Sequence, residues 1–310
     1  MPISTFGQSC GFRLSHGLGP VALHAMGTPL STSQNSEVPR GNEFAFQSGD
    51  FERIRDLIYR KAGISLHAGK QAMVYSRLSR RLRELHVSSF AGYLDALEQA
   101  SGVGADQELQ QFINCLTTNL TAFFREDHHF PVLAGELRRR RNQPIRIWCN
   151  AASTGEEPYS IAMTVVETLG PSAPVQIFCS DIDTKVLDKA RAGVYPADAR
   201  GLTPQLLRRH FFRGTGANAG LARVRPELAR LVDFGVFNLM AARWSLGDPF
   251  DIVFCRNVMI YFDAPTQRRV LEQMRLVMRP QGLLFAGHSE NFASAQDLFR
   301  LRGKTVYERV

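Results

Sequence analysis

Residues 145–163, IRIWCNAASTGEEPYSIAM, constrain the fold of this chain more than any other segment. An apolar run ends in a turn of small residues, and the turn leads into a helix that starts with Glu156 and Glu157. This strand–turn–helix is typical of a doubly wound nucleotide-binding sheet. The turn lacks the G-x-G-x-x-G pattern, and two carboxylates occupy the helix N-terminus at which a phosphate would bind. The pattern therefore favours a cationic nucleoside without phosphates as cofactor, and S-adenosylmethionine fits that description.

The bulk composition is that of an ordinary globular protein. At 310 residues the chain is long enough for two domains, and 44% of its residues are hydrophobic. No apolar run reaches the ~18 residues that a membrane span needs, and the N-terminus lacks the charged and apolar regions of a secretory signal. We therefore expect a cytoplasmic protein without direct membrane insertion.

Cysteine usage and net charge narrow the setting further. The five cysteines are odd in number and include no C-x-x-C pair, which favours reduced thiols over a disulfide framework. The net charge of +8 favours an acidic partner, which could be nucleic acid, a membrane or an acidic protein surface. Charge alone does not choose among these three.

The chain divides into four parts by composition and hydrophobic period. A segment rich in Gly, Ser, Thr and Pro predicts a flexible tail, and apolar residues at helical spacing then predict a small all-α domain. A linker joins this domain to an S-adenosylmethionine-binding domain. The expected bounds are 1–43 for the tail, 44–118 for the all-α domain, 119–130 for the linker and 131–310 for the cofactor-binding domain.

Strand-like and helical patterns alternate in the last part, which predicts a mostly parallel, doubly wound Rossmann-like sheet with helices on both faces. The expected strands are 145–150, 175–181, 232–237, 251–256, 283–287 and 305–309. One interval breaks this alternation, and we interpret it as a small antiparallel β-subdomain inserted at about 205–236. Its glycine-rich loop, 214–220, is interpreted as a hairpin turn rather than a phosphate loop, because no helix follows it directly.

Polar residues stand at the carboxyl ends of the expected strands, where ligands bind in open α/β sheets. They are 150–156, Asp181, Asn238, Arg256 with Asn257, and 288–291. Asp181 is placed to accept hydrogen bonds from ribose hydroxyls, with a helix N-cap as the alternative role. Glu156 could complement the helix dipole or attract a cationic cofactor, and we favour the second role because Glu157 can supply the first.

Three absences restrict the methyl acceptor. The chain has no Asp/Asn-Pro-Pro-aromatic segment for nucleobase amines and no Pro-Cys dipeptide for carbon methylation of pyrimidines. No His/Cys cluster has metal-ligand spacing, so no metal site is expected. An acceptor that needs no activation remains, and a carboxylate with a pKa of ~4.3 is already ionised at neutral pH.

Several long motifs in order resemble those of the CheR-type chemotaxis receptor methyltransferases. They are NLTAFFR at 119–125, AASTGEEPY at 151–159, SDID at 180–183, FCRNVMIYF at 254–262 and GHSEN at 287–291. The resemblance covers the chain from Phe44 to its end. It implies transfer of a methyl group from S-adenosylmethionine to glutamate side chains on the cytoplasmic helices of chemoreceptors for chemotactic adaptation. The products would be glutamate methyl esters and S-adenosylhomocysteine.

The resemblance also implies roles for individual residues. Asn119, Thr121 and Arg125 would close over the cofactor, and Arg125 and Tyr261 would lie near the transferred methyl group as catalytic residues. The remaining cofactor contacts would come from the strand ends, namely Glu156, Asp181, Asn238, Leu239, Arg256 and Asn257. The residue pattern by itself does not single out Asn119, Thr121, Arg125 or Tyr261.

Two surfaces gain a role from the same resemblance. A basic helix face could dock acidic receptor helices, and a solvated helix surface is its alternative; the face comprises Lys70, Arg77, Arg80, Arg81 and Arg83. The β-subdomain resembles that of family members that bind a peptide at the receptor's C-terminus, around Gly214, Gly216 and Gly220. Such a peptide could add as a strand to an exposed sheet edge.

Two other functions stay open from the sequence. One is methylation of RNA or a small molecule, which the basic charge permits and the missing nucleobase motifs weaken, so no nucleic-acid partner is expected. The other is a non-catalytic sensor that binds the cofactor and docks on receptors. Arg125 and Tyr261 argue against such a sensor.

Overall fold

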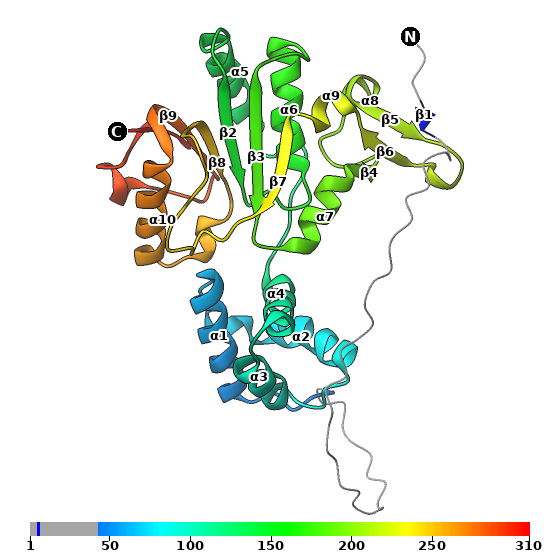
Figure 1. Ribbon diagram of the computed structural model, residues 1–310, viewed down its shortest axis with the longest axis vertical. Helices are drawn as coiled ribbons and strands as arrows, with labels where there is room; N and C mark the ends of the chain where they lie inside the picture. The colour runs from blue at the N-terminus through cyan, green and yellow to red at the C-terminus, as the bar shows by residue number, and fades with distance from the viewer. Residues whose placement is uncertain (1–4, 7–42) are drawn as a thin grey trace, which may run out of the picture.

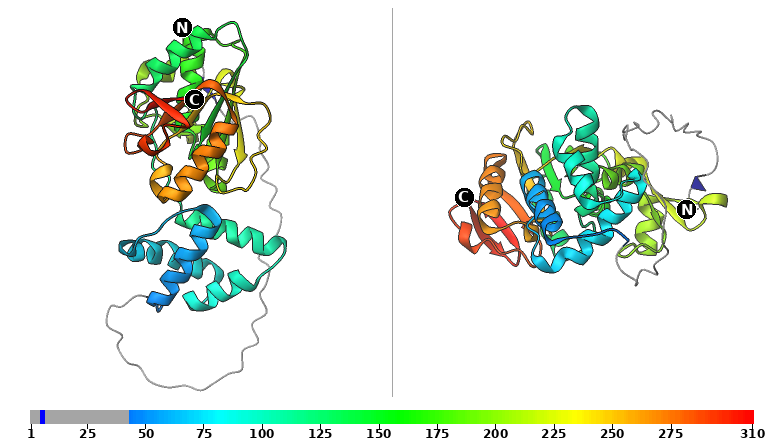
Figure 2. Two further views of the ribbon diagram at one scale, coloured as in Figure 1. Left: turned by 90° about the vertical axis from the view of Figure 1, so that its left-hand side faces the viewer. Right: turned by 90° about the horizontal axis from the view of Figure 1, so that it is seen from below.

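A helical domain and a larger domain built on a β-sheet follow one another along the chain (Figure 1). The computed structural model describes residues 5–6 and 43–310. The helical domain lies against one end of the sheet domain, as two perpendicular views show (Figure 2). Its helices are α1 (Ser48–Ala62), α2 (Gln71–Leu85), α3 (Phe90–Gln99) and α4 (Val103–Leu116).

The first domain forms because apolar side chains recur at helical spacing and meet in one core. In α1, the side chains of Phe51, Ile54, Leu57 and Ile58 are buried and pack against α2, α3 and α4. The helix ends at Gly63, whose φ of 71° lies in the left-handed region that favours glycine. The expected all-α domain is confirmed.

The large sheet has seven strands in the order β10-β11-β9-β8-β2-β3-β7. The contiguous strands from β9 to β7 run parallel, whereas β11 and β10 add an antiparallel edge. This confirms the mostly parallel Rossmann-like sheet. The strands are β2 (Ile145–Asn150), β3 (Val175–Asp181), β7 (Val232–Val236), β8 (Phe250–Cys255), β9 (Met278–Ala286), β10 (Phe299–Gly303) and β11 (Val306–Arg309).

Helices cover both faces of the large sheet. Along β2, Ile147 and Cys149 point into a core shared with α5 and α6, and Trp148 points into the opposite core beneath α10. Alternation along a strand has period two, so a strand buried on both faces reads as a continuous apolar run. The helices are α5 (His129–Arg139), α6 (Glu156–Leu169), α7 (Thr184–Ala192) and α10 (Ala264–Leu276).

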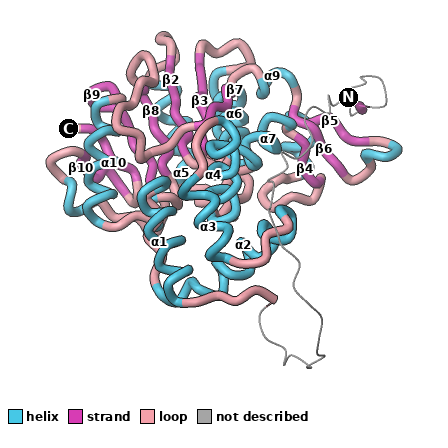
Figure 3. The backbone as a smooth tube through the Cα atoms, turned by 60° about the horizontal axis from the view of Figure 1, so that its bottom comes forward, coloured by secondary structure: helices cyan, strands magenta, loops and turns pink. Residues whose placement is uncertain are grey.

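A second, four-stranded sheet lies to one side of the large sheet, beyond α7 (Figure 3). Its order is β1-β5-β6-β4, and both β5–β6 and β4–β6 are antiparallel, which confirms the small antiparallel insertion. The strands are β1 (Thr5–Phe6), β4 (Val194–Pro196), β5 (Phe211–Gly214) and β6 (Leu221–Val224), with α8 (Pro204–His210) and α9 (Pro226–Ala229) beside them.

The structure differs from the sequence prediction at three places. The small sheet starts at β4, before the expected bound of 205. The expected strand 232–237 is β7 of the large sheet, so the insertion ends before its expected bound of 236. Within the expected flexible tail, β1 pairs in parallel with β5, while residues 1–4 and 7–42 lie outside the described part. Strand β10 was missed because its residues after Phe299 are exposed and largely polar, as suits an edge strand.

The described helices include none that is both long and apolar enough to cross a bilayer.

Candidate active site

A pocket lies between the carboxyl ends of the parallel strands and the helical domain. Three parts of the chain line it: the helical domain, the segment that joins the domains, and the strand ends. Leu66, Lys70 and Met73 come from the first part, and Asn119, Leu120, Thr121 and Arg125 come from the second. This is the edge at which open α/β sheets bind ligands.

The strand-end residues meet in this pocket as the sequence predicts for parallel strands. Asn150 after β2, Asp181 at the end of β3, and Arg256 after β8 all line it. Asn238 and Leu239 after β7, and Asn257 beside Arg256, line it too. The side chain of Asn150 is buried in this lining, next to the thiol of Cys255.

Glu290 anchors one wall of the pocket from behind. Its carboxylate accepts hydrogen bonds from the backbone N–H groups of Asn257, Val258 and Met259, at 2.8–3.0 Å, and from Gly287. Burial raises the pKa of Glu290, against the effect of these four hydrogen bonds. The 288–291 segment therefore holds the loop after β8 in place, and it does not line the pocket.

Asp181 presents a buried carboxylate to the pocket. Its Oδ2 accepts from the backbone N–H of Ser153 at 2.8 Å, and its Oδ1 accepts from that of Asp183 at 2.9 Å. Asp183 caps α7 by accepting from the backbone N–H of Lys185, so Asp181 is not needed as the N-cap. Burial raises the pKa of Asp181 to about 6. Each carboxylate oxygen retains a lone pair that can accept a hydroxyl hydrogen.

The second pocket carboxylate is Glu157. It lines the pocket and forms a 2.5 Å ion pair with the buried guanidinium of Arg256. Glu156 is not among the lining residues, and its Oε2 accepts from the hydroxyl of Thr154 at 2.6 Å. Successive side chains on a helix diverge by about 100°, so the two carboxylates point in different directions. A contact between Glu156 and the cofactor stays a prediction, and Glu157 is a further candidate.

The segment that joins the domains closes one side of the pocket through hydrogen bonds to the sheet domain. The side chain of Asn119 donates to Asp183 at 2.8 Å, and the backbone N–H of Phe124 donates to the hydroxyl of Ser160 at 2.9 Å. The backbone carbonyl of Arg125 accepts from the guanidinium of Arg256. The guanidinium of Arg125 donates to the carbonyl of Leu120 at 2.9 Å and faces the pocket.

Tyr261 and Asn238 join the two domains beside the pocket. The carbonyl of Tyr261 accepts from the backbone N–H of Ser65 at 2.8 Å, and the side chain of Asn238 donates to the carbonyl of Lys61 at 2.7 Å. The sequence does not single out Leu66 or Met73 as pocket residues, because their apolar side chains fit the core of the helical domain equally well.

The basic face of α2 is largely engaged within the protein. Arg77 donates to the carbonyls of Leu116 and Thr117, at 3.0 and 2.7 Å. Arg81 pairs with Glu84 and Glu108, and Arg83 pairs with Glu43. Of the five expected docking residues, Lys70 at the pocket rim is exposed, and the side chain of Arg80 is 72% exposed. Lys70, Arg80 and Arg83 are thus exposed, whereas Arg77 and Arg81 are only partly exposed.

The three glycines of the β-subdomain shape the β5–β6 hairpin. Gly216 and Gly220 have φ of 57° and 84°, in the region that favours glycine. A side chain at Gly214 would collide with the backbone carbonyl of Asn218. These positions therefore have a structural reason to be glycine that is independent of any bound peptide.

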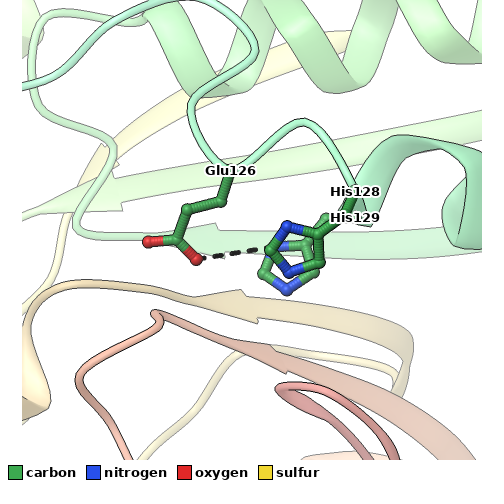
Figure 4. A group of neighbouring side chains, drawn as sticks. All are labelled: Glu126, His128 and His129. Carbon is green, nitrogen blue, oxygen red and sulfur yellow. Dashed lines mark ion pairs between the residues drawn. The ribbon is translucent and has the colours of Figure 1, made fainter.

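A group of metal-ligand type that the sequence analysis did not expect lies behind the pocket. Glu126, His128 and His129 bring potential ligand atoms to within 4.8 Å of one another (Figure 4).

Family models match nearly all of the chain outside its first residues. The model described as CheR methyltransferase, all-alpha domain, matches residues 49–117, and that described as CheR methyltransferase, SAM binding domain, matches residues 119–308. The chain belongs to the CheR methyltransferase family.

Relatives of this CheR methyltransferase align over most of its length. Chemotaxis protein methyltransferase 2 of Pseudomonas aeruginosa is 55% identical over 282 residues, which is 90% of this chain and 99% of the relative. The chemotaxis protein methyltransferase of Escherichia coli is 55% identical over 266 residues, covering 85% of this chain and 91% of the relative. The chain is an S-adenosylmethionine-dependent methyltransferase.

The pocket of this CheR methyltransferase fits its cofactor. Carboxylates at the end of β3 and at the start of α6 suit hydroxyl groups and a cation, and the described pocket contains no glycine-rich phosphate loop. Phe237, Leu239 and Val258 provide apolar wall for a base.

Proposed function

We propose that this CheR methyltransferase esterifies glutamate side chains on chemoreceptors, as its sequence resemblance implies. One observation supports the choice of a carboxylate acceptor: the described pocket lining includes no histidine or cysteine to act as a general base. Of its two carboxylates, Glu157 is paired with Arg256, and we assign Asp181 to the ribose hydroxyls. An acceptor that is already ionised at neutral pH needs no such base.

The chemistry then reduces to positioning. When bound, S-adenosylmethionine supplies a sulfonium-bound methyl group, which a carboxylate oxygen takes as the sulfur–carbon bond breaks, with no proton transferred. Arg125 and Tyr261 border the pocket and orient the incoming carboxylate, Arg125 through its guanidinium. Leu66, Met73 and Leu120 narrow the entrance on the helical-domain side and help to exclude water. Alignment of the reacting groups supplies most of the acceleration.

The ligands of the cofactor follow from the pocket geometry. Asp181 accepts hydrogen bonds from the ribose hydroxyls, and Glu157 faces the cationic end of the molecule. Asn119, Thr121, Arg256 and Asn257 complete the enclosure, and Asn238 and Leu239 border the base. These assignments are supported by the position of each residue in the lining.

Receptor docking involves the accessible cations of the basic face. Lys70 stands at the pocket rim directly before α2, and Arg80 and Arg83 lie on that helix with exposed side chains. Acidic receptor helices would be attracted to these charges and guided toward the pocket. Arg77 and Arg81 serve this surface indirectly by fixing α2 in its domain.

A receptor peptide adds to the outer edge of β5 in our proposal. Strand β1 supports the idea, because Thr5 aligns with Arg213 and Phe6 with Gly214 in a parallel ladder. The edge can therefore pair with an extended segment. A peptide held there would raise the local concentration of receptor side chains near the active site.

The test uses labelled cofactor. Incubation of the protein with methyl-labelled S-adenosylmethionine and cytoplasmic receptor fragments should give label that mild alkali releases as methanol, as a methyl ester requires. Alkali-stable label on the receptor would overturn the carboxylate assignment. Transfer to bulk RNA without transfer to receptors would favour the nucleic-acid alternative, and cofactor binding without turnover would favour a sensor.

A further inference from the structure

Three side chains of metal-ligand type converge where the joining segment enters α5. Glu126 and His128 precede the helix, and His129 is its first residue (Figure 4). Glu126 Oε2 lies 4.0 Å from His129 Nδ1, and the two imidazole rings have centroids 4.2 Å apart. One carboxylate and two imidazoles thus share a small volume outside the cofactor pocket.

One atom of each side chain is buried without a hydrogen-bond partner. These atoms are Glu126 Oε2, His128 Nε2 and His129 Nδ1. The His129 side chain is fully buried, and that of Glu126 is 10% exposed. Buried polar atoms in folded proteins are nearly always satisfied. Potential ligand atoms of the three side chains lie within 4.8 Å of one another, so one bound ion can serve as their shared partner.

The other polar atoms of the group are held by neighbours. His129 Nε2 lies 2.8 Å from the hydroxyl of Thr305. Glu126 Oε1 accepts from His288 at 2.9 Å and from the side chain of Asn257 at 3.3 Å. When His129 Nε2–H donates to Thr305, the Nδ1 lone pair points toward Glu126 Oε2. Outer contacts of this kind orient metal ligands and fix the imidazole tautomer.

One guanidinium lies beside the group. Arg256 lies 3.6 Å from Glu126 Oε2 and 2.5 Å from Glu157. The guanidinium is thus shared between two carboxylates.

We propose that Glu126, His128 and His129 bind a divalent metal ion of the zinc class. Two imidazole nitrogens and one carboxylate oxygen are a common ligand set for Zn²⁺, with the fourth position taken by water. Bonds of about 2.0–2.1 Å in a tetrahedral site place ligand atoms about 3.3 Å apart, so metal binding draws the three side chains together.

The consequence would be structural. Glu126 directly follows Arg125 and contacts Asn257, and both of these residues line the cofactor pocket. A metal ion at Glu126 therefore fixes the joining segment against the sheet domain from behind the pocket. The metal takes no part in methyl transfer.

The test titrates the full-length, chelator-treated protein with Co²⁺, whose absorption reports tetrahedral nitrogen and oxygen ligands. We expect saturation at one equivalent per chain, displacement of Co²⁺ by Zn²⁺, and a rise in Tm when Zn²⁺ is added. His128→Gln and Glu126→Gln should each weaken the affinity at least tenfold. His67→Gln, at an exposed histidine of the helical domain, is the matched control and should change nothing.

Circular dichroism first establishes that each variant is folded. His128→Gln should disturb folding less than Glu126→Gln, because the His128 side chain is only partly buried. Absence of a stoichiometric Co²⁺ spectrum in the wild type would overturn the proposal. Equal affinity in wild type and His128→Gln, or an equal loss in His67→Gln, would overturn it too.

Discussion

At the scale of single residues, the adjacent carboxylates Glu156 and Glu157 make different contacts, because neighbouring side chains on a helix point in different directions. Glu157 faces the pocket and pairs with Arg256, whereas Glu156 turns back to Thr154. The sequence places both at the start of α6 and gives no sign of which one faces the ligand. That choice depends on where the helix begins, and here its first residue is Glu156.

Glu157→Gln should weaken the binding of S-adenosylhomocysteine by 10- to 100-fold, and Glu156→Gln should change it less than twofold. A hydrogen bond to a charged group contributes about 1.5–3 kcal/mol, which corresponds to the larger effect. Calorimetric titration of both variants measures the difference. Equal losses in the two variants, or a loss confined to Glu156→Gln, would show that the pocket carboxylate is misassigned.

The raised pKa of Asp181 predicts that cofactor affinity depends on pH. Burial raises its pKa to about 6 from an ordinary value of 3.8, so the free protein loses stability as the pH rises between these values. The ionised carboxylate is the better hydrogen-bond acceptor, so affinity should fall as the pH drops through 6, approaching tenfold per unit. Asp181→Asn should bind weakly at pH 7 and show a flat profile from pH 5 to 7. A pH profile that is identical in wild type and variant would contradict this role.

At the scale of secondary-structure elements, helix α2 carries two kinds of arginine. Some bind other parts of the protein, and others are exposed to solvent. Its apolar period correctly predicts the buried Val74, Leu78 and Leu82. The sequence could not predict that Arg77 and Arg81 bind α4, because a long arginine can extend along the boundary of an apolar face to a partner distant in sequence. Arg81 reaches Glu108, and Tyr93 donates to the same carboxylate.

Arg81→Ala should therefore destabilise the protein by about 1–3 kcal/mol, because it leaves the partly buried Glu108 without its cation. Arg80→Ala is the matched variant. Its exposed ion pair with Glu84 contributes at most about 1 kcal/mol, so stability should hardly change. Thermal unfolding of both variants measures these effects.

Arg80→Ala should leave stability almost unchanged but should impair receptor methylation. At low ionic strength, Arg80→Ala should raise the apparent KM for receptor fragments severalfold, and added salt should reduce the difference. S-adenosylhomocysteine affinity should stay the same in Arg80→Ala. Unchanged receptor kinetics in this variant would remove Arg80 from the docking surface.

At the scale of the whole molecule, the alternation of strands and helices was enough to predict the sheet, and the order of polar strand ends was enough to predict its functional edge. The contact between domains was not predictable. Tyr59 donates to Asp263 at 2.9 Å across 204 residues, and Asn114 donates to Thr184 at 3.0 Å across 70. No local pattern encodes such pairs, so the helical-domain wall of the pocket emerged only from the structure.

The pairing of β1 with β5 makes a prediction about the small sheet. If a receptor C-terminal peptide adds to the same edge, β1 must leave before the peptide can bind. A chain that starts at Glu43 should therefore bind this peptide more tightly than the full chain, by a few-fold. Fluorescence anisotropy of a labelled peptide measures both affinities. Weaker binding by the shorter chain would show that the peptide does not compete with β1.

The central claim is that the pocket delivers a methyl group to a carboxylate without a general base. Mass spectrometry of receptor fragments after incubation with S-adenosylmethionine and the protein tests it most directly. We predict that glutamate side chains gain one methyl group each, that mild alkali removes it, and that replacing those glutamates with alanine abolishes transfer. Methylation on lysine, on a backbone amide or on nucleic acid instead would contradict the account.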